Sequence, residues 1–330
     1  MTGPRRARTL GLVLTSTFVL LSGYALRADT GPVRPDSPFV LVLGTAQDGG
    51  IPHLGGTAAP DLAARRDPAH RRLVTSLLVV DPRSGRRWLL DASPDLALQL
   101  DRAEAIAPLR APAAGERRAP VLDGIFLTHA HVGHYLGLAQ LGREIYSASA
   151  LPVHGSARMV DFLAKNGPWE QLVRLGQIEL RTLTPGTPVA LAPDLTVTAL
   201  VVPHRDEYTD TLAFEVRGPR RALLYLPDID KWERWTTPIE SILARVDVAL
   251  LDATFYSEGE LPGRSMAEVP HPLVVESIVR FAKLPESERR KVVFTHLNHS
   301  NPAALPDTPE RRAIEAAGHR VAEELERIDL

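Results

Sequence analysis

The 330-residue chain contains no cysteine. Disulfide bonds, thiolate metal sites and a cysteine nucleophile are therefore excluded at every position, and a bound metal would have to be held by His, Asp or Glu. Lysine is also scarce: only four of the 38 basic residues are lysine, and no run or face rich in Lys and Arg stands out. A nucleic-acid partner is accordingly not expected.

Long apolar runs are absent except near the N-terminus. Residues 1–28 carry three arginines within positions 5–8, an apolar run over 10–21 and a small-residue stretch ending at Ala28. This pattern predicts a cleaved secretory signal peptide, and so an exported protein, periplasmic or extracellular. The apolar run is short for a membrane span, although an uncleaved anchor is the alternative; after cleavage no stable span is expected. Losing four arginines and no acids changes the formal charge from −2 to −6.

The rest of the chain is rich enough in apolar residues, at 44% overall, to form a large core. We expect a short linker over 29–36 and a single domain over 37–330. Short β-branched or Leu-rich runs bounded by turn residues predict strands at 38–44, 72–81, 86–93, 122–129, 150–156, 178–183, 195–204, 211–218, 221–228, 246–254 and 291–297. Helical periodicity appears at 94–106, 136–146, 156–165, 234–244, 272–283 and 309–327.

The segment TLAFEVRGPRRALLYL, residues 211–226, is typical of a hairpin that turns at Gly218 and Pro219. A hairpin at this place favours two sheets flanked by helices, of the α+β class, over a doubly wound parallel sheet.

Histidines and aspartates gather where predicted strands end. The segment FLTHAHVGHYLGL, residues 126–138, holds three histidines within six positions. Strand ends at one edge of a sheet converge in space, so polar groups there indicate a site. Burying three adjacent imidazoles without a cation has no evident benefit, which favours a metal site. The polar residues at strand exits are His129, His131, His204, His296, Asp91, Asp228 and Asp252, and His134 is expected past the turn at the start of the next helix.

The segment THAHVGH, residues 128–134, resembles the first metal motif of the metallo-β-lactamase superfamily, T-H-x-H-x-D-H. His204, Asp228 and His296 resemble that superfamily's later histidine, bridging aspartate and final histidine, in the same order. VLGTAQDGGIPHLGG (42–56), HAHVGHYLGL and LNHSNP look most like the coenzyme PQQ synthesis protein B-like group. The resemblance covers about residues 38–302 and implies a metallo-β-lactamase-like αββα four-layer sandwich.

The resemblance implies one or two divalent metal ions, zinc first, with iron or manganese as alternatives. A first metal is expected on His129, His131 and His204, and a second on His134 and His296, with Asp228 bridging and taking part in catalysis. His271 matches a non-ligand histidine of phosphodiesterase-like members and is the candidate proton donor. Residues expected to orient ligands or to substitute for one are Asp48, His53, Asp91, Asp252 and His299.

Simpler explanations exist for several of these residues. His204 and Asp228 fit turn or helix-cap positions, and Asp230 competes with Asp228 for any role. His271 before a proline fits a helix entry. We expect His70 and His319 on the surface.

Gly133 departs from the superfamily motif, which has an aspartate at that place. The second metal then lacks its own carboxylate, so the sequence predicts weaker binding there unless Asp48 or His299 reaches in. Substituting aspartate for Gly133 is accordingly predicted to strengthen the second site.

Two functions follow from the sequence. The first is an exported hydrolase in which a metal-activated water attacks an ester, phosphodiester, lactone or amide bond of a small-molecule substrate. The alternative is an iron-dependent oxygenase or redox enzyme with one metal, as the likeness to the PQQ synthesis protein B group suggests. A non-catalytic binding protein ranks third, and the sequence makes no prediction of oligomeric state.

Overall fold

The computed structural model describes residues 1, 3, 36–261, 263 and 265–330. The expected signal peptide and nearly all of the expected linker lie outside the described residues. The described residues from 36 to 330 belong to one compact unit. Within the described part of the chain, no helix combines the length and the apolar character needed to cross a membrane.

The described residues form two mixed seven-stranded sheets. The first has the order β14 (Arg327–Asp329), β1 (Phe39–Gly44), β2 (Ser76–Asp81), β3 (Arg86–Leu90), β4 (Gly124–Phe126), β5 (Leu151–Gly155) and β6 (Ile178–Thr182). The second has the order β13 (Arg320–Val321), β12 (Val292–Thr295), β11 (Val248–Asp252), β10 (Ala222–Leu226), β9 (Thr211–Arg217), β8 (Leu195–Val202) and β7 (Pro188–Ala192). The predicted hairpin is confirmed, because β9 and β10 pair antiparallel with Val216 opposite Leu223.

The central strands are apolar throughout because both of their faces are buried. In β2, Leu77 belongs to the core between the two sheets, whereas Leu78 belongs to the core under the helices of the first sheet. In β10, Leu223 faces the core between the sheets and Leu224 the core under the helices of the second sheet. Three apolar cores therefore separate four layers, and the predicted αββα sandwich is confirmed.

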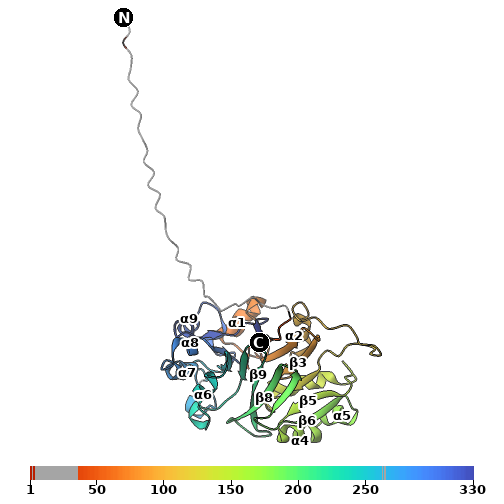
Figure 1. Cartoon of the computed structure of the whole chain (residues 1–330). Helices are drawn as coiled ribbons and strands as arrows, with labels where there is room; N and C mark the ends of the chain where they lie inside the picture. The colour runs from red at the N-terminus through yellow and green to blue at the C-terminus, as the bar shows by residue number, and fades with distance from the viewer. Residues whose placement is uncertain (2, 4–35, 262, 264) are drawn as a thin grey trace. The chain divides into compact units, whose positions relative to one another are not determined.

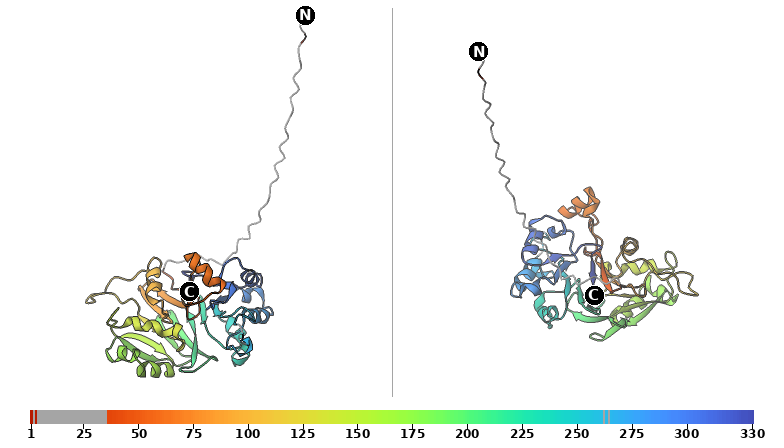
Figure 2. Two further views of the ribbon diagram at one scale, coloured as in Figure 1. Left: turned by 180° about the vertical axis from the view of Figure 1, so that it is seen from behind. Right: turned by 45° about the horizontal axis from the view of Figure 1, so that its top comes forward.

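Helices cover the outer face of each sheet. The helices are α1 (Ala59–Arg66), α2 (Leu96–Ala103), α3 (Val132–Tyr135), α4 (Ala157–Lys165), α5 (Trp169–Arg174), α6 (Ile239–Leu243), α7 (Val274–Phe281), α8 (Glu286–Arg289) and α9 (Pro309–Ala316). Leu163 of α4 and Leu172 of α5 pack into the core of the first sheet, and Phe281 of α7 and Ile314 of α9 into that of the second. Figure 1 shows these two groups of helices on opposite sides of the strands, and Figure 2 shows the same separation from behind.

The predicted helix over 309–327 is wrong beyond Ala316. Gly318 has φ +88°, a left-handed conformation that ends a helix readily. Arg320–Val321 then pairs with β12 and Arg327–Asp329 with β1, so the C-terminus contributes an edge strand to each sheet. His319 is buried, not on the surface as expected, and its Nδ1 lies 2.9 Å from the carbonyl oxygen of Arg289.

Candidate metal centre

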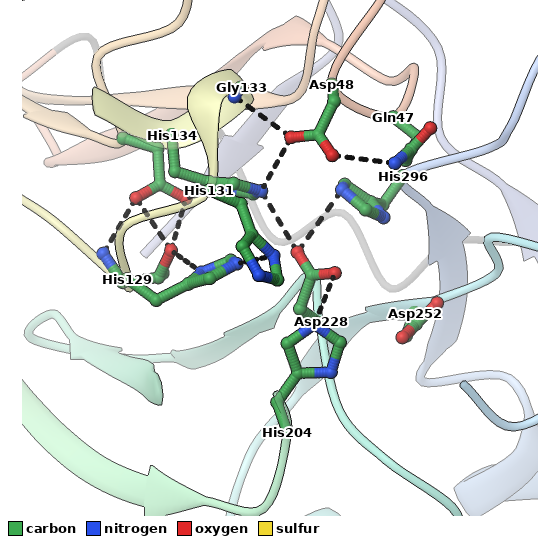
Figure 3. Close-up of polar contacts among 12 residues, drawn as sticks. Gln47, Asp48, His129, His131, Gly133, His134, His204, Asp228, Asp252 and His296 are labelled. Atoms are coloured by element: carbon green, nitrogen blue, oxygen red, sulfur yellow. Dashed lines mark hydrogen bonds and ion pairs between the residues drawn. The ribbon is translucent and has the colours of Figure 1, made fainter. Parts of the chain in front are cut away.

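The predicted ligands meet at one edge of the sandwich, where strands of both sheets end. His129 and His131 follow β4 of the first sheet, and His134 lies in α3 directly after them. His204, Asp228 and His296 follow β8, β10 and β12 of the second sheet. Figure 3 shows the six side chains pointing toward one another. Each sheet thus supplies three of them.

The five histidines fall into two groups that correspond to the two expected sites. Single ligand atoms of His129, His131 and His204 lie within 4.8 Å of one another, and the same holds for atoms of His134 and His296 together with Asp48. The five histidines therefore divide between two places as the sequence predicts, and their roles as metal ligands stay a prediction.

Asp228 lies between the two groups. Its Oδ2 is 3.0 Å from Nε2 of His134 and 3.2 Å from Nε2 of His296, and its Oδ1 is 3.6 Å from Nε2 of His204. Asp230, the competing aspartate, instead accepts hydrogen bonds from the Lys231 N–H and from Arg234. Asp228, and not Asp230, therefore lies where the sequence predicts a bridging carboxylate.

The polar atoms of this cluster fit bound cations. Nε2 of His134, Nε2 of His296, both ring nitrogens of His204 and Oδ2 of Asp228 are buried and have no partner with hydrogen-bond geometry. Leaving a buried polar group unpaired costs about 1–3 kcal/mol. Several such atoms facing one another are accounted for by nitrogen and oxygen ligation of a divalent metal.

Hydrogen bonds on the outer side of the rings fix which nitrogens face the centre. Thr128 Oγ1 lies 3.0 Å from Nδ1 of His129, and Thr254 Oγ1 lies 2.9 Å from Nδ1 of His296. Glu207 contacts Nε2 of His131 at 3.2 Å. Such outer partners orient metal-binding histidines and set the nitrogen that binds.

Asp91 and Asp252, both expected to orient ligands, occupy equivalent places at the ends of β3 and β11, each beside residues that contact histidines of the cluster. Asp91 is fully buried; its carboxylate accepts hydrogen bonds from the backbone and hydroxyl of Thr128 and from Tyr225, and lies 2.8 Å from Nδ1 of His134. Asp252 accepts from the Thr254 hydroxyl at 2.7 Å.

The candidate proton donor, His271, lies beside the cluster. Its Nδ1 is 2.7 Å from Oδ2 of Asp252, and its ring centroid is 5.0 Å from that of His204. Its backbone N–H donates to the Val269 carbonyl oxygen, so it precedes α7 without entering it. His271 therefore lies next to the cluster, and its role as proton donor stays a prediction.

Burial and neighbouring charges shift the pKa values of the histidine rings in different directions. Burial lowers the pKa of His129 and of His296 well below the usual value, and neighbouring histidines lower both further. Burial opposes the charged form of His134 as well, but Asp91 and Asp228 raise its pKa well above the usual value. Burial raises the pKa of Asp228 despite His134. Neutral imidazoles, the form that binds metal, are thus favoured at His129 and His296.

The space beside Gly133 is filled by Asp48. The Gly133 N–H donates to Oδ1 of Asp48 at 2.9 Å, and Oδ1 is 3.8 Å from Nε2 of His134. Figure 3 shows this carboxylate between Gly133 and the histidines.

His299, the other residue expected to substitute, does not reach the cluster. Its Nδ1 lies 2.7 Å from buried Asp61, and its ring stacks on that of His53 at 4.5 Å. Among the described residues neither histidine has a hydrogen bond to a member of the cluster. Four residues that contact the site or its neighbours were not predicted from the sequence: Asp61, Thr254, Tyr225 and Glu207. One signal was available for Thr254, because LLDAT at 250–254 repeats LLDAS at 89–93.

Comparison with known proteins gives consistent matches. A family model described as the beta-lactamase superfamily domain matches residues 86–297. Coenzyme PQQ synthesis protein B from Methylobacterium sp. (strain 4-46) is 28% identical over 305 residues, covering 86% of this chain and 96% of that protein. The protein of that name from Xanthomonas axonopodis pv. citri (strain 306) is 27% identical over 308 residues, covering 86% and 97%.

Solved structures with the same fold include Zn²⁺-bound PqqB from Methylobacterium extorquens, with a TM-score of 0.73, 22% identity and coverage of 88% of this chain and 100% of that one. A diphosphatase from the PhnP family has a TM-score of 0.63 and 21% identity, covering 89% and 97%. At these identities the structural matches establish the fold alone.

Proposed function

Because the chain belongs to the metallo-β-lactamase superfamily, we propose that it is a metal-dependent hydrolase that directs a water molecule onto an ester, phosphodiester, lactone or amide bond of a small molecule. The observation that carries the proposal is the pair of ligand groups joined by Asp228. His129, His131 and His204 would hold one divalent metal, and His134 and His296 the other. Zinc suits the all-nitrogen and oxygen donor set, as do iron and manganese.

When bound, the metals supply an acidified water as nucleophile and stabilise negative charge that develops on the substrate. The chain's own residues position these events. Asp228 faces both ligand groups and so fixes their spacing. Asp91 and Thr254 orient the rings of His134 and His296, respectively, so that Nε2 of each points toward the centre. His271, held at Nδ1 by Asp252, is placed to give a proton to the leaving group.

The test combines metal analysis with a hydrolysis panel. Protein purified without added metal is analysed for zinc, iron and manganese, then assayed on phosphodiester, lactone, amide and ester substrates. We expect metal-dependent turnover of at least one class, and a fall of about 10²–10⁴-fold in kcat for His271→Asn, because loss of a general acid costs that much. The variant should keep its metal content, which separates proton donation from metal binding.

The similarity to PQQ synthesis protein B motivates a second candidate, an iron-dependent oxygenase or redox enzyme. One iron per chain with O₂-dependent turnover and no hydrolysis would contradict the hydrolase. Two zinc ions per chain would contradict the oxygenase.

We also propose that the protein is exported after cleavage behind Ala28, on the pattern of residues 1–28. In a Gram-negative host, mass spectrometry of the periplasmic fraction is expected to find a mature chain that begins at Asp29. An intact N-terminus on protein confined to the cytoplasm would contradict export.

A further inference from the structure

Asp48 occupies the space that a side chain at position 133 would need. It lies in the turn after β1, far from Gly133 in the sequence. A Cβ built on Gly133 would meet the Asp48 carboxylate directly and would lie 2.7 Å from the Asp48 Cα, closer than real Cβ contacts come. A side chain at residue 133 and the present position of Asp48 therefore exclude each other.

Because Asp48 fills the space that a side chain at position 133 would need, we infer that Asp48 is the carboxylate ligand of the second metal. The turn after β1 then supplies this ligand in place of an aspartate at position 133. The inference rests on the proposed metal centre and names a residue within it. The second site then consists of Asp48, His134 and His296 with the shared Asp228.

The distances suit a shared cation. Two ligands with bonds of about 2.1 Å can stand at most about 4.2 Å apart, and Oδ1 of Asp48 is 3.8 Å from Nε2 of His134. Nε2 of His134 and Nε2 of His296 are buried without hydrogen-bond partners. A second carboxylate also offsets charge that Asp228 alone would leave uncompensated between two dications.

The rest of the turn holds Asp48 in this orientation. Its other oxygen, Oδ2, accepts a hydrogen bond from Nε2 of Gln47 at 2.7 Å, and Oε1 of Gln47 accepts one from Nδ2 of Asn298 at 2.8 Å. Asn298 is two residues after His296, so this chain of hydrogen bonds fixes Asp48 relative to another ligand of the same site. Oδ1 is left directed at His134 (Figure 3).

The competing explanation is that Asp48 only anchors the backbone through the Gly133 N–H. Asp48→Asn distinguishes the anchoring role from the metal-binding role. The side-chain oxygen of asparagine still accepts the hydrogen bond from Gly133, but it lacks the negative charge of a carboxylate ligand. The matched control is Asp67→Asn, since Asp67 also accepts a backbone N–H, from Ala69, and is exposed.

The experiment titrates metal-free full-length protein with Zn²⁺ by calorimetry and measures metal content after dialysis. We expect two zinc ions in the parent protein and in Asp67→Asn, whereas Asp48→Asn should weaken the second Kd at least about 100-fold, the upper end of what losing an outer partner costs. Circular dichroism of the metal-free variants should coincide, which shows that the fold is kept.

A reciprocal substitution provides a second test. Gly133→Asp alone is expected to lose the second zinc, because its side chain displaces Asp48. The prediction from sequence is the opposite, a stronger second site, so this variant distinguishes the two. Gly133→Asp combined with Asp48→Gly should regain two zinc ions. An unchanged second Kd in Asp48→Asn would overturn the inference and leave the hydrolase intact, whereas a parent protein that binds no metal would overturn the proposed function itself.

Discussion

Replacing His129 with alanine is expected to abolish metal binding at the first site and, with it, turnover of every substrate that the parent protein hydrolyses. His129 is 1% exposed, and its Nε2 points into the cluster, where it lies 2.7 Å from Nδ1 of His131. With His129 gone, the first metal would keep only His131, His204 and a share of Asp228, one buried histidine fewer than in the parent protein. The loss of affinity should exceed the roughly 10–100-fold that removal of an outer hydrogen-bond partner costs.

The control for this variant is His70→Ala. His70 lies in the short turn Pro68–His70, is partly exposed and is not among the residues grouped as candidate ligands. It should keep the parent's metal content and activity. If His129→Ala also keeps both, as measured by elemental analysis and initial rates, the assignment of the first site is wrong.

Substituting asparagine for Asp91 is expected to lower the free energy of unfolding and to reduce the amount of bound metal. The Asp91 carboxylate faces hydrogen-bond donors of Thr128, His134 and Tyr225, and asparagine would turn an NH₂ group toward some of them. Breaking a buried charged pair costs about 3–5 kcal/mol. Asparagine tolerates the left-handed backbone at this position, φ +64°, so the change isolates the carboxylate.

The measurement is urea unfolding with a chelator present, so that metal loss does not contribute, followed by separate metal analysis. Tyr225→Phe is the matched control, because it removes only the donor 3.1 Å from Asp91 and should cost about 1 kcal/mol without loss of metal. An Asp91→Asn protein as stable and as metal-rich as Tyr225→Phe would show that Asp91 does not orient the ligands.

The residues of the cluster were predictable from the sequence because most of them follow an apolar run that is long enough to mark a strand. His129 after GIFLT and His296 after KVVFT are examples. Their convergence then follows from the general rule that strand ends meet at one edge of a sheet. The terminal strands escaped prediction, since two or three residues such as Arg320–Val321 are too short to show a period.

The meaning of Gly133 was beyond the sequence for a different reason. Residues 48 and 133 are brought together only by the packing of the β1 turn against α3, a contact that no local pattern encodes. The sequence identified a missing carboxylate and two residues able to replace it. The choice of Asp48 over His299 depended on Asp61, which holds His299 away and had given no signal of its own.

Because the proposed ligands come from two different sheets, the distances between them depend on how far apart the two sheets lie. His129 and His134 are attached to one sheet, and His204 and His296 to the other. The distance between the two sheets is set by close-packed side chains such as Phe126 and Phe214, whose rings are 5.9 Å apart. Interiors packed this tightly transmit small changes of volume. The affinity of the proposed centre for a cation would then depend on apolar residues between the sheets that never touch the cation.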